Sequence, residues 1–386
     1  MYLAPTERQQ RLRAELRSYF RTVLPETGEP ADGRALLRRI GADGWLGLGW
    51  PVEYGGQGRG ADEQFVFFDE AYRAGAPVSM VTLNTVGPTL MKYGSEHQKT
   101  YFLPRILAGE LVFAIGYTEP AAGTDLASLR TRAVREGDGW RIDGQKIFTS
   151  GAQHADWIWL ACRTDPDAPP HRGISLVLVP TDAPGFSWTP IETVGGQTTT
   201  ATYYDGVRVP AQNLVGAENA GWSLITSQLN HERVALAAIG MQAEEFHAAV
   251  LAVARTPDPV NGRRRMDEPW VRERLAEAHA RLAATRLLNW RLVGDVGAGR
   301  LAPGDASGVK VAGTESAVAV YRMCQQVLGT DGLEGLVRSG SPGAFEDGEL
   351  ERLNRAAQIN TFGGGVSEVQ REIVATMRLG MTRGRR

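Results

Sequence analysis

The chain has 386 residues, of which 42% are hydrophobic and 22% charged, and its formal net charge is -2. This length predicts two or three domains, and the near-neutral charge argues against nucleic acid or an anionic membrane as a main partner. No apolar run approaches the ~18 residues of a membrane span, so we expect no membrane association and no targeting segment. The two cysteines, Cys162 and Cys324, are too few for a disulfide framework and favour a cytoplasmic location.

The first part of the chain, residues 1–110, is predicted to be a helical domain. Four segments show the three- and four-residue spacing of apolar side chains that is typical of amphipathic helices: Thr6–Phe20, Ala35–Ile40, Asp62–Ala74 and Ser95–Leu107. The stretch from Gly44 to Gly58 contains too much glycine and proline for a regular element. It also lacks the strand and the G-x-G-x-x-G spacing of a dinucleotide loop, so we expect a structured connector.

The middle part, residues 111–215, is predicted to be a β-domain, because short β-branched or aromatic segments alternate with turn residues. The expected strands are Val112–Gly116, Leu129–Val134, Trp140–Asp143, Lys146–Thr149, Trp157–Arg163, Ile174–Val179 and Tyr203–Val209. Asp138-Gly139 and Asp143-Gly144 are expected to be turns between them. Strands spaced in this way indicate a sandwich or a barrel rather than a doubly wound parallel sheet.

The last part, residues 216–386, is predicted to be a bundle of four long amphipathic helices. These helices are expected at Trp222–Ala254, Trp270–Val296, Asp305–Val327 and Leu350–Leu379. The strand pattern is absent from this part of the sequence.

The polar turn from Tyr117 to Asp125 is the first candidate site. It follows the apolar run Leu111–Ile115 and presents small side chains and hydroxyls. It is not a phosphate loop, because the segment after it has the pattern of a strand instead of a helix. Such a turn suits a flat, polar-edged ligand such as a flavin ring, although an ordinary strand-to-strand turn has the same residue types.

Glu232 is the second candidate, because it occupies an inward-facing position of the first bundle helix. The apolar stripe around it is formed by Ile225, Leu229, Leu236 and Ile239. A buried carboxylate either pairs with a cation on a neighbouring helix or acquires the raised pKa of a general base, and the spacing leaves both interpretations open. Arg233 points about 100° away around the helix. The six scattered histidines show no metal-binding spacing, so we expect no metal.

Four motifs in order resemble the acyl-CoA dehydrogenase family over essentially the whole chain. They are Phe113–Pro120 with Gly123-Thr124-Asp125, then Asp143–Gly151, Gln326–Gly329 and Gly363–Arg371. The resemblance implies an α+β multidomain fold with a helical N-terminal domain, a β-barrel middle domain and a C-terminal four-helix bundle. It also implies bound FAD, α,β-dehydrogenation of a coenzyme A thioester, and an electron-transfer flavoprotein as the electron acceptor.

The resemblance assigns expected roles to the residues of the flavin signatures. Thr118, Thr124 and Ser150 would contact the flavin ring or its neighbouring phosphate, and Tyr117 and Phe148 would pack on the ring. Gly123 belongs to the same signature.

The catalytic residues implied by the resemblance depart from the pattern of many members. Those members carry a catalytic glutamate at the position of Gly364, whereas a minority place it on the first bundle helix immediately before an arginine. In this sequence Glu232 occupies the position used by the minority, and Arg233, which follows it, would bind the substrate. The backbone N–H of Gly364 and a ribityl hydroxyl of FAD would then bind the thioester carbonyl oxygen.

A second departure concerns the quaternary structure. The Arg-x-x-Phe-Gly motif that reaches a neighbour's FAD in homotetramers is missing near Val260–Arg265. Both departures resemble the base-carrying subunit of α2β2 dehydrogenases that act on steroid (cholesterol-type) side-chain acyl-CoA thioesters. The alternatives are a homotetrameric branched- or medium-chain acyl-CoA dehydrogenase, an oxidase that passes electrons to oxygen, and a non-catalytic scaffold subunit of such a pair.

Overall fold

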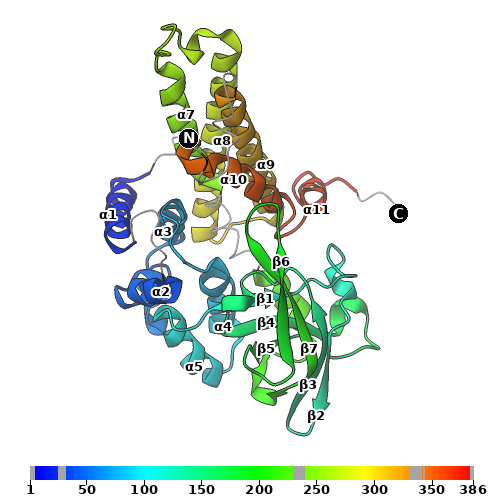
Figure 1. The fold of residues 1–386 in the computed structure, drawn as a ribbon. Coiled ribbons are helices and arrows are strands. Elements are labelled where there is room, and N and C mark those ends of the chain that lie inside the picture. The colour runs from blue at the N-terminus through cyan, green and yellow to red at the C-terminus, as the bar shows by residue number, and fades with distance from the viewer. Residues whose placement is uncertain (1–4, 25–31, 229–239, 330–340, 342–343, 383–386) are drawn as a thin grey trace. The chain divides into compact units, whose positions relative to one another are not determined.

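The computed structural model describes residues 5–24, 32–228, 240–329, 341 and 344–382 (Figure 1). The chain forms two compact units. One comprises Met1–Gln10, Val194–Gln197 and Leu236–Arg386, and the other comprises Arg11–Thr193 and Thr198–Ala235. The predicted three-domain boundaries at 110 and 215 stay a prediction, and each unit is described by itself.

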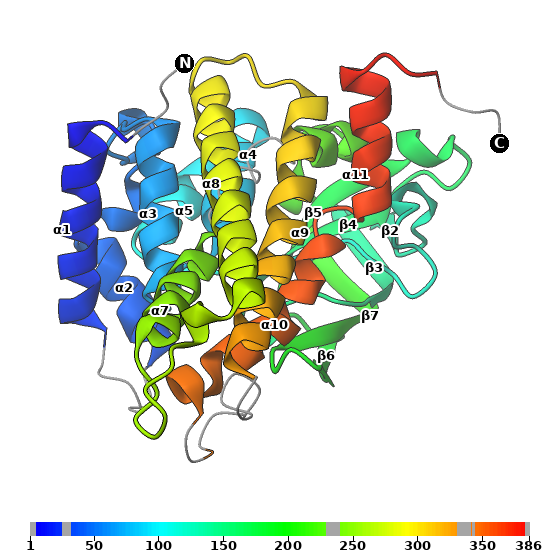
Figure 2. The same cartoon turned by 90° about the horizontal axis from the view of Figure 1, so that it is seen from above.

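Five α-helices are described in the first part of the chain: α1 (Glu7–Val23), α2 (Gly33–Ala42), α3 (Ala61–Arg73), α4 (Gly87–Tyr93) and α5 (Glu96–Leu107). The Asp32 carboxylate caps α2 by accepting the N–H of Arg34 and of Ala35. Ser95 and Gln98 form a capping box at the start of α5. Helices α2 to α5 lie together in blue and cyan (Figure 2). The π-helix Val81–Val86 and α4 were missed by the sequence analysis.

The β-structure is an eight-stranded sheet in the order β6-β7-β3-β2-β4-β5-β8, with β1 paired to β4. The strands are β1 (Phe113–Gly116), β2 (Arg132–Glu136), β3 (Gly139–Lys146), β4 (Trp157–Arg163), β5 (Ile174–Pro180), β6 (Phe186–Glu192), β7 (Thr198–Pro210) and β8 (Leu214–Val215). Strands β4 and β5 are buried along nearly their whole length, which explains their continuous apolar sequence.

The predicted turn at Asp143-Gly144 is wrong, because these residues lie inside β3. Ile142 pairs with Val207 but Gly144 pairs with Tyr204, so β7 has one residue more than β3 in this interval and carries a bulge. Gly144 has φ 153, and a Cβ built on it would lie 2.7 Å from the Cα of Thr131. Only glycine fits this close approach. The predicted strands Trp140–Asp143 and Lys146–Thr149 are therefore one strand that ends at Lys146.

The helices after residue 240 are α7 (Ala243–Arg255), α8 (Pro269–Gly297), α9 (Pro303–Leu328), α10 (Glu349–Ala357) and α11 (Ser367–Ile373). Helices α8 and α9 lie side by side (Figure 2). The hydrophobic core of this unit includes Val250 of α7, Leu282 of α8 and Cys324 of α9. Among the residues described, no helix combines the length and the hydrophobicity that crossing a membrane requires.

Of the predicted long helices, one is tested only in part and one differs from the structure. Residues 221–228 are helical and α7 begins at Ala243, but 229–239 lie outside the described residues, so the prediction for Trp222–Ala254 is tested only at its two ends. The prediction of one helix over Leu350–Leu379 is wrong. Helix α10 ends at Ala357, and the chain passes through a 3-10 turn and a glycine loop before α11, because Gly364 and Gly365 have φ 67 and 106.

Candidate active site

The turn after β1 is held closed by its own backbone. The N–H of Glu119 donates to the carbonyl of Ala122 at 3.0 Å, and the N–H of Ala122 donates back at 3.1 Å. Gly123 and Thr124, which follow, are exposed. A Cβ built on Gly123 would meet only the methyl of Thr118, at 3.9 Å. The turn therefore presents an open surface in which the hydroxyl-bearing residues are not covered by larger side chains.

A buried ion pair ties this turn to β3. Lys146, the last residue of β3, is fully buried, and its Nζ donates to Oε1 of Glu119 at 2.8 Å and to the Tyr117 carbonyl at 3.0 Å. The Glu119 carboxylate also accepts the backbone N–H of Arg130 and of Thr131, at 2.7 and 2.8 Å. Burial alone would raise the pKa of Glu119, but Lys146 and the N–H donors hold the pKa below its ordinary value.

The two flavin-type motifs are adjacent in the structure. The N–H of Ile147 donates to the Thr118 carbonyl at 2.9 Å, which brings the segment after β3 beside the turn. Phe148 is 59% exposed and has φ 59, an uncommon backbone conformation for an aromatic residue. The Ser150 hydroxyl lies 2.9 Å from the hydroxyl of Thr199 on β7. An exposed aromatic ring and neighbouring hydroxyls thus meet on one surface.

Tyr117 has a more buried environment than the rest of this surface. Its hydroxyl accepts a hydrogen bond from Nε1–H of Trp159 at 3.0 Å and donates to Oε1 of Gln228. Gln228 is 2% exposed, and its Nε2 has no partner among the described residues. The sequence analysis assigned no role to Gln228, which lies at the end of the helical segment 221–228.

Gly364 belongs to the other unit, in the loop between α10 and α11. The N–H of Gly363 donates to the Ile359 carbonyl at 2.8 Å, and Nε2 of Gln370 donates to the Gly364 carbonyl at 3.3 Å. The N–H of Gly364, by contrast, has no acceptor in the part of the chain that the structure describes. Buried Lys310 of α9 donates to two carbonyls of the same loop. The carbonyls of Thr361, Gly364 and Gly365 are thus bonded, while the Gly364 N–H is available for a ligand.

Glu232 and Arg233 lie outside the described residues, so their predicted roles stay predictions. Of the apolar stripe predicted around Glu232, Ile225 is described and is 4% exposed, which agrees with an inward-facing position. Lys146, Glu119 and Lys310 were missed as site residues. In β3 Lys146 continues the alternation of the buried residues Trp140 and Ile142, and a lysine at such an inward-facing position is the signal that would have revealed it.

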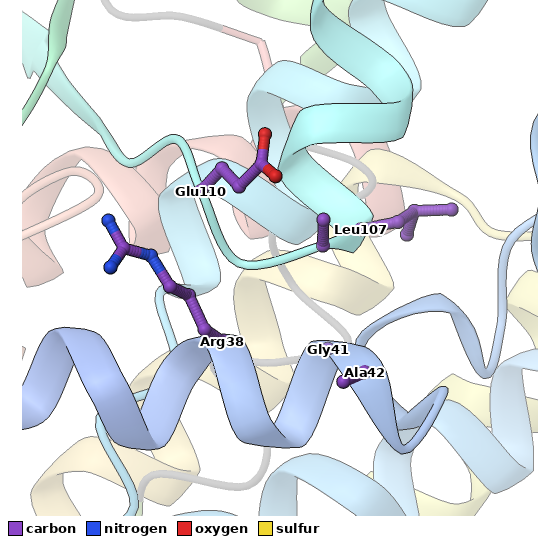
Figure 3. Close-up of a pocket in the computed structure, with 6 residues that line it drawn as sticks. Arg38, Gly41, Ala42, Leu107 and Glu110 are labelled. Carbon is purple, nitrogen blue, oxygen red and sulfur yellow. The ribbon is translucent and has the colours of Figure 1, made fainter.

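The surface pocket in Figure 3 is separate from these residues. It has a volume of about 440 Å³ and is lined by Arg38, Gly41, Ala42, Leu107, Ala108 and Glu110, from α2 and α5 and the turn after α5. None of the predicted site residues lines it. We therefore assign the site from the motif residues and not from this pocket.

Comparison with known families shows which protein family these motifs belong to. Models of the acyl-CoA dehydrogenase N-terminal, middle and C-terminal domains match residues 6–110, 114–207 and 219–379. The chain belongs to the acyl-CoA dehydrogenase family. The family-level fold prediction is thereby confirmed, and the protein is an oxidoreductase that acts on the CH–CH bond of CoA thioesters. Members of the family are FAD-binding flavoproteins.

Several relatives match over the full length of the chain. Acyl-CoA dehydrogenase FadE26 of Mycobacterium tuberculosis is 49% identical, with 100% of both chains covered. Among solved structures, the Tcur3481-Tcur3483 steroid ACAD is 55% identical, with a TM-score of 0.93 and 100% of both chains covered. The ChsE4-ChsE5 complex from Mycobacterium tuberculosis is 50% identical, with a TM-score of 0.92 and again full coverage.

In this acyl-CoA dehydrogenase, the turn after β1 and the segment after β3 fit the isoalloxazine ring of FAD. The observation is that Phe148 is held exposed by a left-handed backbone, next to a turn where no side chain fills the space at Gly123. An aromatic face suits a flat heteroaromatic ring, and hydroxyls and backbone N–H groups suit its polar edge. Thr118, Thr124 and Ser150 would supply the polar contacts, and Phe148 the aromatic one.

Proposed function

We propose that this chain is the base-carrying subunit of a heteromeric, FAD-dependent dehydrogenase that acts on a CoA thioester with a steroid (cholesterol-type) side chain. The observation that carries the proposal is full-length similarity, at 55% and 50% identity, to chains of a steroid acyl-CoA dehydrogenase pair and of a two-component complex. The electron acceptor in this proposal is an electron-transfer flavoprotein. A cytoplasmic location also stays a prediction.

The backbone at Gly364 supports a base located elsewhere than in the tail loop. Its φ of 67 lies in the left-handed region, where a residue with a side chain costs roughly 1–2 kcal/mol relative to the right-handed conformation. A glutamate at this position would carry that cost. Glycine removes it, and it also leaves room for a bulky acyl chain beside the thioester.

In the proposed reaction Glu232 takes the α-proton of the thioester as the general base. The negative charge that develops on the carbonyl oxygen is stabilised by the N–H of Gly364, which is left available by its own loop. FAD, held by the residues of the two flavin motifs, would supply the two-electron acceptor for the hydride of the β-carbon. The products are the α,β-unsaturated thioester and reduced flavin, so protons and electrons balance.

The loop that would carry the missing arginine motif supports a shared flavin site. Within it Arg264 is paired with Asp267 at 2.8 Å, and the Asp258 carboxylate accepts the N–H of Val260 and of Asn261. Val260 is 92% exposed at the tip. A loop folded back on itself in this way suits a subunit whose flavin contacts on the adenine side come from a different partner chain.

The experiment is to measure FAD content and native mass of this chain alone and after co-expression with a second acyl-CoA dehydrogenase-like chain. We expect little FAD alone and about one FAD per pair of unlike chains in an α2β2 assembly. One FAD per chain in a homotetramer would instead favour an ordinary branched- or medium-chain enzyme. A panel of thioesters, from branched short chains to steroid side chains, then identifies the substrate class.

Two further alternatives have direct tests. Substantial peroxide release during turnover would indicate an oxidase. Glu232→Gln separates a catalytic subunit from a scaffold: we expect it to abolish bleaching of the flavin by substrate. If bleaching persists in that variant, the base lies in the partner and this chain is a scaffold.

A further inference from the structure

Lys310 is a nearly buried cation that is bonded to the Gly364 loop. It lies on α9 and is 9% exposed. Its Nζ donates to the carbonyl of Thr361 at 3.0 Å and to the carbonyl of Gly365 at 2.8 Å. Within the described part of the chain no carboxylate lies within ion-pair distance of it. A buried ammonium that is bonded to neutral carbonyls is costly, so a purely structural tether would be better served by a neutral donor.

The two carbonyls that Lys310 binds lie on either side of Gly364. Gln370 holds the Gly364 carbonyl, and the Ser367 hydroxyl donates to the Thr361 carbonyl at 3.1 Å. The bonded carbonyls of Thr361, Gly364 and Gly365 restrain the backbone on both sides of the Gly364 N–H, and therefore the conformation of the loop that carries it. The N–H that the proposed function requires, that of Gly364, has no acceptor among the described residues.

We propose that Lys310 is a positioning residue that fixes the Gly364 N–H toward the thioester carbonyl and strengthens it through its positive charge. The inference rests on the proposed role of Gly364 as the donor to that oxygen. The ammonium polarises the loop's peptide groups, and its field stabilises negative charge on an acceptor bound at the neighbouring N–H. The charge therefore stabilises the enolate as it forms, and it contributes little to binding of the neutral thioester.

The test uses the holoenzyme with its partner and a thioester that cannot be oxidised. The acyl group 3,3-dimethylbutanoyl has α-hydrogens but no β-hydrogen, so exchange of the α-hydrogens with D2O reports enolate formation without hydride transfer. Exchange is followed by mass spectrometry as a function of thioester concentration. FAD content and Tm of each variant show whether it is folded.

We expect Lys310→Met to lower the maximal exchange rate about tenfold to a hundredfold, less than the loss of an entire oxyanion-hole donor. The half-saturating thioester concentration should change less than threefold. Lys310→Arg, which keeps the charge, should retain the rate within threefold, and Lys310→Gln, which keeps a donor but not the charge, should fall below Lys310→Arg. Ser367→Ala removes a bond to the same Thr361 carbonyl and keeps the ammonium, so its loss should be smaller than that of Lys310→Met.

The inference is overturned if Lys310→Met exchanges within twofold of the parent enzyme, or if Lys310→Arg falls as far as Lys310→Met. Should Lys310→Met fail to fold, Lys310→Gln and Lys310→Arg decide the question, since they differ in charge while both keep a donor. Failure of the proposed function is distinguishable. If the parent holoenzyme exchanges no α-hydrogen of any thioester, the role of Gly364 is wrong, whereas exchange combined with a preference for short acyl chains removes only the steroid assignment.

Discussion

The Nζ of Lys146 lies 2.8 Å from a carboxylate oxygen of Glu119, and both side chains are buried. Through this pair the strand in which the second flavin motif begins is bonded to the turn that forms the first. The predicted flavin contacts on the two segments therefore depend on an interaction that itself need not touch a ligand.

Lys146→Met is expected to destabilise the protein by about 3–5 kcal/mol, because it leaves the Glu119 carboxylate buried without its counter-ion. It should also lower FAD content. Urea unfolding and flavin absorbance measure the two effects. The matched control is Arg208→Met, which breaks an exposed pair with Glu136 and should leave both quantities unchanged. Replacing both partners, with Lys146→Met and Glu119→Leu together, should restore part of the stability; equal loss in the single and double variants would contradict the explanation.

Gly364→Ala is expected to lower the free energy of unfolding by roughly 1–2 kcal/mol, because φ is 67 at this residue. Gly364→Glu should in addition reduce turnover of bulky acyl chains more than that of short ones, which a substrate panel would reveal. Gly299→Ala is the control: its φ is 64 and no atom lies within 4 Å of the added Cβ. The control should show the strain without the change in substrate preference. Unchanged turnover of a bulky thioester by Gly364→Glu would refute the argument from space.

The α-hydrogen exchange rate is expected to decline at alkaline pH. Burial lowers the pKa of Lys310, opposed by the Glu315 carboxylate on the same helix and the Glu368 carboxylate on α11. Because the proposed effect needs the charged form, the rate should fall as pH rises through a pKa below that of an ordinary lysine. In Lys310→Arg the guanidinium stays charged, so this decline should disappear. The same decline in both enzymes would assign it to another group.

Both cysteines are expected to resist thiol reagents in the native protein. Burial raises the pKa of Cys162 to about 12 and that of Cys324 to about 12, so neither forms the reactive thiolate near pH 8. Thiol titration with a chromogenic disulfide should give no reaction under native conditions and two thiols after denaturation. Rapid labelling of the native protein would mean that a core opens on the timescale of the assay.

The sequence predicted best those elements whose own residues determine them. Strand β4, Trp157–Arg163, was predicted with its observed bounds, because its continuous apolar run has clear turn residues on each side. Helix α5 begins directly after its N-cap Ser95, which forms a capping box with Gln98, and this interaction is local in sequence. The four family motifs are likewise recognisable from their own residues, without knowledge of the fold.

The errors occurred where a contact distant in sequence decides the local structure. Gly144 was predicted to lie in a turn, but its backbone is determined by the close approach of Thr131 and by the bulge of the paired strand β7. Strand β6 was missed because it contains a proline, is largely exposed, and forms by pairing with β7. In the sequence Lys310 cannot be distinguished from an ordinary lysine of a helix. Its hydrogen-bond partners are the carbonyls of Thr361 and Gly365, which lie 51 and 55 residues later in the chain.

Helix α9 carries Lys310 near its start and Gln326 near its end, sixteen residues apart on one uninterrupted helix. At about 1.5 Å per residue, their separation along the axis is about 24 Å. The helix thus acts as a molecular ruler between the loop proposed to hold the thioester carbonyl and the turn that resembles a dinucleotide contact. Inserting or deleting a single residue between them would change that length by about 1.5 Å and rotate one end by about 100°, so the constraint on this helix falls on its length as much as on its side chains.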